Sequence, residues 1–126
     1  MFEAEAIMTT DVVTVGKETP VYDAVEILLE SGVTGLPVVE DDMTLAGVIT
    51  EKDVLTLLSE ATDESATVEK FMTRDVVSFE TDVDLIEICE CLTQSDFRRV
   101  PIVSQGRLKG VISRKDIIKY IIEPIG

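Results

Sequence analysis

The sequence predicts a mixed α+β fold made of two β-α-β-β-α repeats packed sheet to sheet with pseudo-twofold symmetry. Two alignments of the chain with itself predict the duplication. Shifted by 64 positions, M8-T-T-D-V-V-T-V15 matches M72-T-R-D-V-V-S-F79, and shifted by 63, L45-A-G-V-I-T-E-K-D53 matches L108-K-G-V-I-S-R-K-D116. We therefore expect repeats at 1–60 and 68–126, joined by a linker at 61–67. A repeat of about 60 residues is marginal alone, so the pair should share one core.

The first half of each repeat should be a strand followed by a helix. A β-branched run at 12–15 predicts the strand, and Thr19 is expected to cap the helix, with Pro20 in its first turn. Apolar residues then recur at i, i+3, i+4, i+7 and i+8, which is the spacing of one helical face. These residues are Val21, Ala24, Val25, Leu28 and Leu29.

The second half of the first repeat should be a hairpin followed by a helix. Apolar runs at 36–39 and 45–50 flank a polar turn, and a helix is expected from about 51 to 60. The second repeat has the same order of patterns. Its expected elements are a strand at 76–79, a helix begun by Thr81 with Asp84 and faced by Leu85, Ile88, Cys89 and Leu92, strands at 100–103 and 108–113 around Gln105-Gly106, and a last helix that Pro124 ends.

The composition excludes several classes of protein. Eleven bases against 25 acids give a net charge of -14, which argues against nucleic acid and against anionic membranes. No apolar run approaches the ~20 residues that a membrane helix needs. The first ten residues carry acids where a signal peptide would carry bases, so we expect a cytoplasmic protein. With no histidine, and with Cys89 and Cys91 facing different directions on a helix, neither a zinc site nor a disulfide is expected.

The repeated ending G-V-I-[T/S]-x-K-D supports two interpretations. Thr50 with Asp53, and Ser113 with Asp116, have the spacing of a capping box, in which the hydroxyl stabilises the helix by about 1 kcal/mol. However, both copies carry aspartate where glutamate or glutamine is usual, and both lie at a strand-to-helix corner, where ligands gather. A carboxylate can also accept hydrogen bonds from both vicinal hydroxyls of a ribose. The two roles are compatible.

The order of M-T-x-D-V-V, L-P-V-V and G-V-I-T-x-K-D over nearly the whole chain resembles the CBS domain, named after cystathionine beta-synthase. The resemblance implies a stand-alone pair that acts as a regulatory sensor and binds AMP, ADP, ATP or S-adenosylmethionine in clefts between its repeats. It implies that Asp53 and Asp116 accept from the ribose, with Thr50 and Ser113 near ribose or phosphate. The site at Asp53 would add Ser78 and Phe97–Val100, and the site at Asp116 would add Thr14 and Val33–Leu36. Ile49 and Ile112 would also line the clefts.

The phosphates of such a ligand need positive charge, and the repeats differ in what they offer. Before the L-P or V-P pair, the first repeat has V33-T-G and the second has F97-R-R. Arg98 and Arg99 are the best candidates for phosphate binding, because a guanidinium matches phosphate oxygens. Arg114 and Lys115, at a helix start, are further candidates. Thr34 and Gly35 lack charge but allow a close backbone approach. The two sites should therefore be unequal.

The net charge also bears on the ligand. A fully charged triphosphate is disfavoured by a chain of net charge -14, which favours AMP or ADP, or ATP with Mg²⁺; no other cofactor is expected. A cationic sulfonium ligand meets less electrostatic cost, so S-adenosylmethionine stays open.

Catalysis is not expected, since the chain has no histidine for proton transfer and no nucleotide-binding glycine motif. The rival to a ligand sensor is a ligand-free scaffold, because both final helices are very apolar and leftover apolar faces suggest an interface. The resemblance implies a homodimer. An arm at residues 1–6 and the linker are expected to pass a signal to an effector protein.

Overall fold

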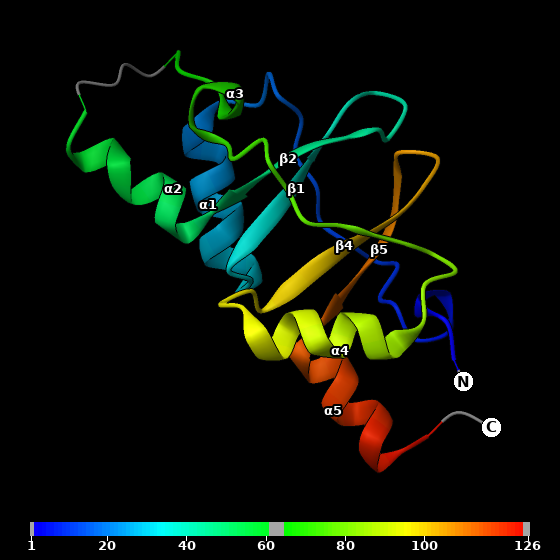
Figure 1. The fold of residues 1–126 in the computed structure, drawn as a ribbon. Helices are drawn as coiled ribbons and strands as arrows, with labels where there is room; N and C mark the ends of the chain where they lie inside the picture. Colours follow the sequence, from blue (N-terminus) through cyan, green and yellow to red (C-terminus); the bar gives the residue numbers. More distant parts are fainter. Residues whose placement is uncertain (1, 61–64, 125–126) are drawn as a thin grey trace. The chain divides into compact units, whose positions relative to one another are not determined.

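A computed structural model describes residues 2–60 and 65–124 and divides the chain into two compact units (Figure 1). The central unit comprises Val13–Val76, and the terminal unit comprises Met1–Val12 together with Val77–Gly126. The units therefore do not coincide with the sequence repeats. Each M-T-x-D run lies in the same unit as the G-V-I strand of the other repeat. Four residues of the expected linker at 61–67 lie outside the described residues.

The central unit is built on an antiparallel hairpin. Its strands β1 (Gly35–Val39) and β2 (Leu45–Thr50) pair with Gly35 opposite Thr50, and Val15 adds one parallel bridge to Val38. Helix α1 (Val21–Ser31) lies against β1 (Figure 1). The unit is completed by α2 (Glu51–Leu55), the 3₁₀ turn η2 (Thr56–Leu58) and the short helix α3 (Val68–Phe71).

The terminal unit repeats this plan with a longer hairpin. Strands β4 (Arg99–Ser104) and β5 (Arg107–Ser113) are antiparallel, and β3 (Phe79–Glu80) pairs parallel to β4. Gln105 and Gly106 have φ values of 54° and 79° and form the turn that was expected between these two strands. Helices α4 (Leu85–Gln94) and α5 (Arg114–Ile122) and the 3₁₀ turn η1 (Ala4–Ala6) complete the unit (Figure 1).

Both hairpins and both strand-to-helix corners are confirmed, whereas the two first strands were predicted too long. Of the run at 12–15 only Val15 pairs, and of the run at 76–79 only Phe79 lies in a strand. Val13 and Val77 are 48% and 44% exposed, so these β-branched residues have neither a ladder partner nor a buried face over most of the run. β-propensity alone therefore did not make a strand.

The predicted start of α1 and the predicted end of α2 were wrong, and the predicted start of α4 was right at Asp84 but not at Thr81. The N-cap of α1 is Pro20, and the Thr19 hydroxyl instead accepts a hydrogen bond from the Gly16 amide at 3.0 Å. At α4 the cap is Asp84, which accepts from Ile86, and Thr81 lies upstream. Helix α2 ends at Leu55 and continues only as a 3₁₀ turn, because the Thr56 hydroxyl bonds the Asp53 carbonyl at 2.7 Å and competes with helical pairing.

Each unit has its own apolar core. The predicted stripe of α1 is confirmed at Val21, Ala24 and Leu28, but Leu29 is 84% exposed, and Ile27 packs at the core's edge instead. The core of the terminal unit holds α4 against β4 and β5 through Leu85, Ile88, Leu92, Val100, Ile102 and Ile112.

The first residues are part of that core, so the expected free arm at 1–6 is wrong over its described residues. Ala4 is fully buried, and its amide donates to the Val83 carbonyl at 2.9 Å. The Glu5 amide donates to the Thr81 carbonyl at 3.0 Å. The small side chain of Ala4 allows this close packing.

Candidate functional site

In each unit the two repeated motifs pair with each other. The Thr73 amide donates to the Val48 carbonyl at 2.8 Å, and the Val48 amide donates back to Thr73 at 2.9 Å. The terminal unit has the same exchange between Thr9 and Val111, at 2.8 and 2.9 Å. The M-T segment of one repeat therefore forms an antiparallel bridge with the G-V-I strand of the other repeat.

The glycine of each G-V-I motif makes this pairing possible. A Cβ atom on Gly47 would lie 2.5 Å from the Thr73 carbonyl oxygen, and one on Gly110 would lie 2.6 Å from the Thr9 carbonyl oxygen. No side chain can occupy that space without moving backbone. The glycine recurs in both motifs and was visible in the sequence, but its role required the position of the M-T segment.

The two predicted capping boxes are confirmed. The Thr50 hydroxyl accepts from the Asp53 amide at 3.2 Å, while Asp53 Oδ2 accepts from the Thr50 amide at 2.9 Å. Ser113 and Asp116 make the same pair of bonds at 3.2 and 2.8 Å. All four residues are half-buried, so each carboxylate is fixed at the corner between a strand and a helix.

A second contact on each carboxylate was missed by the sequence reasoning. The Thr73 hydroxyl lies 3.1 Å from Asp53 Oδ1 and 3.3 Å from Oδ2, and the Thr9 hydroxyl lies 3.2 Å from Asp116 Oδ1. Each threonine comes from the M-T pair of the segment that docks on the strand. The signal in the sequence was this threonine's recurrence in both copies of M-T-x-D.

The loops that were expected to face the base meet the same corners. The Thr34 carbonyl accepts from the Glu51 amide at 2.9 Å in the central unit, and the Arg98 carbonyl accepts from the Arg114 amide at 3.0 Å in the terminal unit. Within each unit, the segment before L-P or V-P thus lies beside that unit's own capping box. The pairing that the resemblance implies joins the carboxylate of one repeat to the loop of the other, and it stays a prediction.

The predicted lining residues differ in exposure. Ser78 and Phe97 are exposed, and Thr14, Val33 and Thr34 are half-buried. Gly35 is buried in β1, and four apolar side chains lie in the cores rather than on an accessible surface. These four are Leu36 (1% exposed), Ile49 (0%), Val100 (1%) and Ile112 (0%).

The candidate phosphate ligands are in the terminal unit, where they differ in their contacts. Arg98 and Lys115 are exposed and Arg99 is half-buried. Burial lowers the pKa of the Arg99 guanidinium, and the nearby charge of Asp116 partly opposes that shift. Arg114 is already bonded: its Nε donates to the Phe97 carbonyl at 3.1 Å and its Nη2 to the Ser95 carbonyl at 3.0 Å, which holds the loop before β4.

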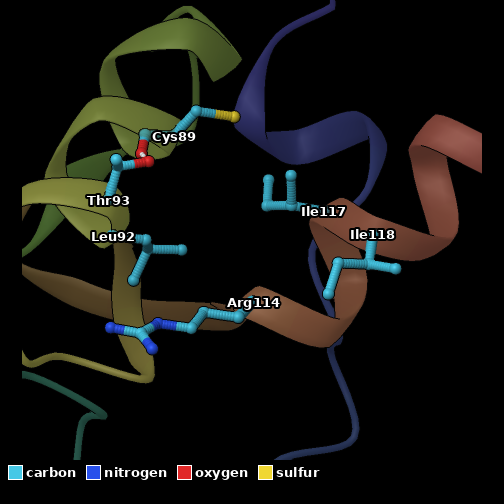
Figure 2. A pocket seen from close by; sticks show the side chains of 6 residues that line it. All are labelled: Cys89, Leu92, Thr93, Arg114, Ile117 and Ile118. Atoms are coloured by element: carbon cyan, nitrogen blue, oxygen red, sulfur yellow. Dashed lines mark hydrogen bonds between the residues drawn. The ribbon is translucent and has the colours of Figure 1, made fainter.

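The terminal unit also has a pocket of about 330 Å³ between α4 and α5 (Figure 2). Figure 2 shows Cys89, Leu92 and Thr93 of α4 opposite Arg114, Ile117 and Ile118 of α5. Burial raises the pKa of the Cys89 thiol, and the charges of Asp84 and Glu90 add to the rise. Of the candidate ligand-binding residues only Arg114 lines this pocket.

Residues 2–60 and 65–124 lack the features of two other kinds of site. In this part of the chain, His, Cys, Asp and Glu side chains form no group of three that could hold a metal ion. No helix there has both the length and the apolar character to cross a bilayer.

Known proteins resemble the chain over most of its length. The CBS domain model matches residues 4–60 and again residues 68–123. An uncharacterized protein of Methanocaldococcus jannaschii is 35% identical over 115 residues, covering 91% of this chain and 41% of the relative. Inosine-5'-monophosphate dehydrogenase of the same organism is 34% identical over 118 residues, covering 93% of this chain and 23% of the enzyme. The chain therefore spans less than half the length of these curated relatives.

The fold has close counterparts among solved structures. CBSX2, a CBS-pair protein of Arabidopsis thaliana solved in complex with AMP, is 29% identical and superposes with a TM-score of 0.87, covering 98% of each chain. The duplication, the paired motifs and these similarities lead to one conclusion: the chain belongs to the CBS-domain family and consists, over the matched residues, of two tandem CBS domains.

Proposed function

We propose that this chain is a regulatory sensor that binds an adenosine-containing ligand, AMP, ADP or ATP, and signals its level to a partner protein. The observation that carries the proposal is the pair of fixed carboxylates, Asp53 and Asp116, each held by a capping box at a strand-to-helix corner. A carboxylate whose orientation is fixed can accept from vicinal ribose hydroxyls with little loss of side-chain entropy. The AMP complex of the similar CBSX2 supports the ligand class.

The distribution of charge supports unequal sites. Arg98 and Arg99 offer two guanidinium groups for phosphate, whereas the corresponding Thr34 and Gly35 offer none. The repeat that carries the arginines should supply the stronger contacts to phosphate. Because the chain has a net charge of -14, AMP and ADP are favoured over free ATP, and ATP is expected with Mg²⁺.

S-adenosylmethionine is the second candidate ligand. The central unit has fourteen acids and four bases in its sequence, so a cationic sulfonium group would be attracted where a polyphosphate would be repelled.

A ligand-free scaffold is the candidate from another class. Leu55 and Leu58 are 67% and 93% exposed, and Ile121 and Ile122 are 70% and 74% exposed. These side chains follow or belong to the final helix of each repeat, and covering them requires an interface. We propose a homodimer formed through these faces. In either case the module acts by binding and not by catalysis.

Isothermal titration with AMP, ADP, ATP with and without Mg²⁺, and S-adenosylmethionine tests the proposal. Asp53→Asn and Asp116→Asn keep an oxygen for the cap but remove the charge, so each should weaken nucleotide binding about tenfold or more. Arg99→Gln should weaken the binding of AMP. It should leave the binding of adenosine, which has no phosphate, unchanged. A wild-type chain that binds none of the panel, yet sediments as a dimer, contradicts the sensor and supports the scaffold.

A further inference from the structure

We propose that Thr9 and Thr73 compete with the ligand's sugar for the two aspartates and so set its affinity and sugar specificity. The inference rests on the proposed function, because it concerns the same carboxylates. Both threonine hydroxyls donate to carboxylate oxygens that a ribose would need, at 3.1 to 3.3 Å. Both threonines are exposed, so their bonds are the ones that an arriving ligand reaches.

At Asp116 the argument follows from the number of acceptor positions. A carboxylate offers about four such positions. Oδ2 accepts from the Ser113 amide at 2.8 Å and is 3.1 Å from the Ser113 hydroxyl, while Oδ1 accepts from Thr9 at 3.2 Å. One position is left, whereas a ribose diol that donates both hydroxyls needs two.

Of the three bonds at Asp116, the one from Thr9 gives way most easily. The Ser113 amide is held by the start of α5, and the Ser113 hydroxyl is held by the Asp116 amide at 3.2 Å. Thr9 is held to Val111 through its backbone, so its hydroxyl can rotate away while the strand pairing stays intact. Binding a diol therefore exchanges the Thr9 bond for a sugar bond.

At Asp53 the argument follows from position. The Thr73 hydroxyl is 3.1 Å from Oδ1 and 3.3 Å from Oδ2, so it lies in front of the carboxylate and nearly equidistant from its two oxygens. That is where a vicinal diol makes two parallel hydrogen bonds. Thr73 too is held by its backbone, to Val48, so its hydroxyl can turn aside without undocking the segment.

Competition of this kind predicts a preference between sugars. A 2'-deoxy sugar donates a single hydroxyl and can use the position left open at Asp116 without displacing Thr9. A ribose must displace the threonine, so the threonines weaken binding of the ribose ligand more than binding of the deoxyribose ligand. Their removal should increase the discrimination in favour of ribose.

The test compares AMP with 2'-deoxyadenosine monophosphate by isothermal titration, on the wild-type chain and on Thr9→Val, Thr73→Val and the double variant. Valine matches threonine in shape and keeps the backbone pairing. One hydrogen bond contributes about 1 kcal/mol, so AMP affinity should rise about threefold to tenfold in the double variant. In Thr9→Val the affinity for the deoxy ligand should change less than twofold, because that ligand can use the position left open at Asp116.

Two controls separate this effect from a general change in the protein. Thr10→Val alters the neighbouring exposed threonine and should leave both affinities unchanged. Thr9→Ser and Thr73→Ser keep the hydroxyl and should retain the wild-type affinity for AMP. Thermal denaturation checks that each variant is folded.

The outcomes distinguish this inference from the proposed function. If the wild-type chain binds no nucleotide, the proposed function fails and this inference fails with it. If the wild-type chain binds AMP but folded Val variants bind it equally, the threonines do not compete. Weaker binding by these variants would also overturn competition, since it would show that the hydroxyls support the ligand.

Discussion

The central and terminal units have the same backbone scheme but different side-chain chemistry. In both, a segment from the other repeat is held by three equivalent backbone bonds upstream of the M-T pair. These bonds join Phe2, Ala4 and Glu5 to Leu85, Val83 and Thr81 in the terminal unit, and Ala66, Val68 and Glu69 to Val21, Thr19 and Lys17 in the central unit. The scheme depends on main-chain atoms, which leaves the side chains free to diverge.

The divergence is concentrated in charge. By sequence, the central unit carries a net charge of -10 and the terminal unit a net charge of -4. Arg99 begins β4, whereas the corresponding position of β1 is Gly35. The two units therefore share a backbone scheme but differ in net charge and in the residue that begins the first strand of the hairpin.

The largest expected effect comes from a substitution that disrupts the packing of the first residues against the core of the terminal unit. Ala4 is fully buried, so Ala4→Asp places an unpaired charge in the core and should cost about 3 kcal/mol or more. Urea denaturation monitored by circular dichroism measures this loss in the free energy of unfolding. Ala6→Asp is the matched control, because Ala6 is exposed in the same 3₁₀ turn and should tolerate the acid. Equal stability of the two variants would mean that the first segment is not part of the core.

A smaller effect is expected from substituting the glycine that allows the M-T segment to pair with the G-V-I strand. Gly47→Ala brings a Cβ to 2.5 Å from the Thr73 carbonyl oxygen, and the required backbone shift should cost about 1–3 kcal/mol. At Gly16 the nearest atoms are 3.8 Å from the same added carbon, so Gly16→Ala should change the free energy of unfolding little. Gly110→Ala should resemble Gly47→Ala. A clear difference between these two would show that the docking is not equivalent in the two units.

The smallest effect concerns an ion pair that the central unit has and the terminal unit lacks. Lys17 Nζ lies 2.7 Å from Glu40 Oε1, and the corresponding position of the second repeat is Thr81. The hydrogen bond and charge of Glu40 raise the pKa of Lys17 above its ordinary value of 10.5. A raised pKa means that this stabilisation is complete below pH 10.5 and is lost as the pH rises through the higher folded value.

Lys17→Met should therefore lower the melting temperature slightly at pH 7 to 9, and the deficit should shrink above pH 10.5. Because Lys17 is solvent-accessible, the change should be small. Lys52→Met removes an exposed lysine as the control and should leave the melting temperature nearly unchanged. A deficit that persists unchanged at high pH would assign the effect to packing of the lysine stem.

The sequence predicted best those features that depend on local order. The hairpins and the two capping boxes were correct, because apolar runs, turn residues and T/S-x-x-D spacing act over a few positions. The strands at 12–15 and 76–79 were predicted too long, because their β-branched residues indicate an extended chain but not whether a partner lies beside it. Leu29 was assigned to the wrong face because α1 packs through Ile27 instead.

The features that the sequence did not reveal depend on contacts between distant positions. The buried place of Ala4 and the threonine bonds to Asp53 and Asp116 follow from which repeat receives each M-T segment. A single sequence contains both partners of such a contact but does not state that they meet. The two copies of M-T-x-D and of G-V-I-[T/S]-x-K-D were each recognised, yet their mutual contact was not.

Each G-V-I strand pairs with the M-T segment of the other repeat, and this arrangement has a consequence for the order of assembly. Thr73 meets Asp53 across 20 positions, whereas Thr9 meets Asp116 across 107. For a flexible chain, closing the longer loop costs about 1.5 kcal/mol more in entropy. On the ribosome, the nascent chain contains every part of the central unit once residue 76 has emerged. The first twelve residues must wait for the last strand and helix to be synthesised before their own unit can close.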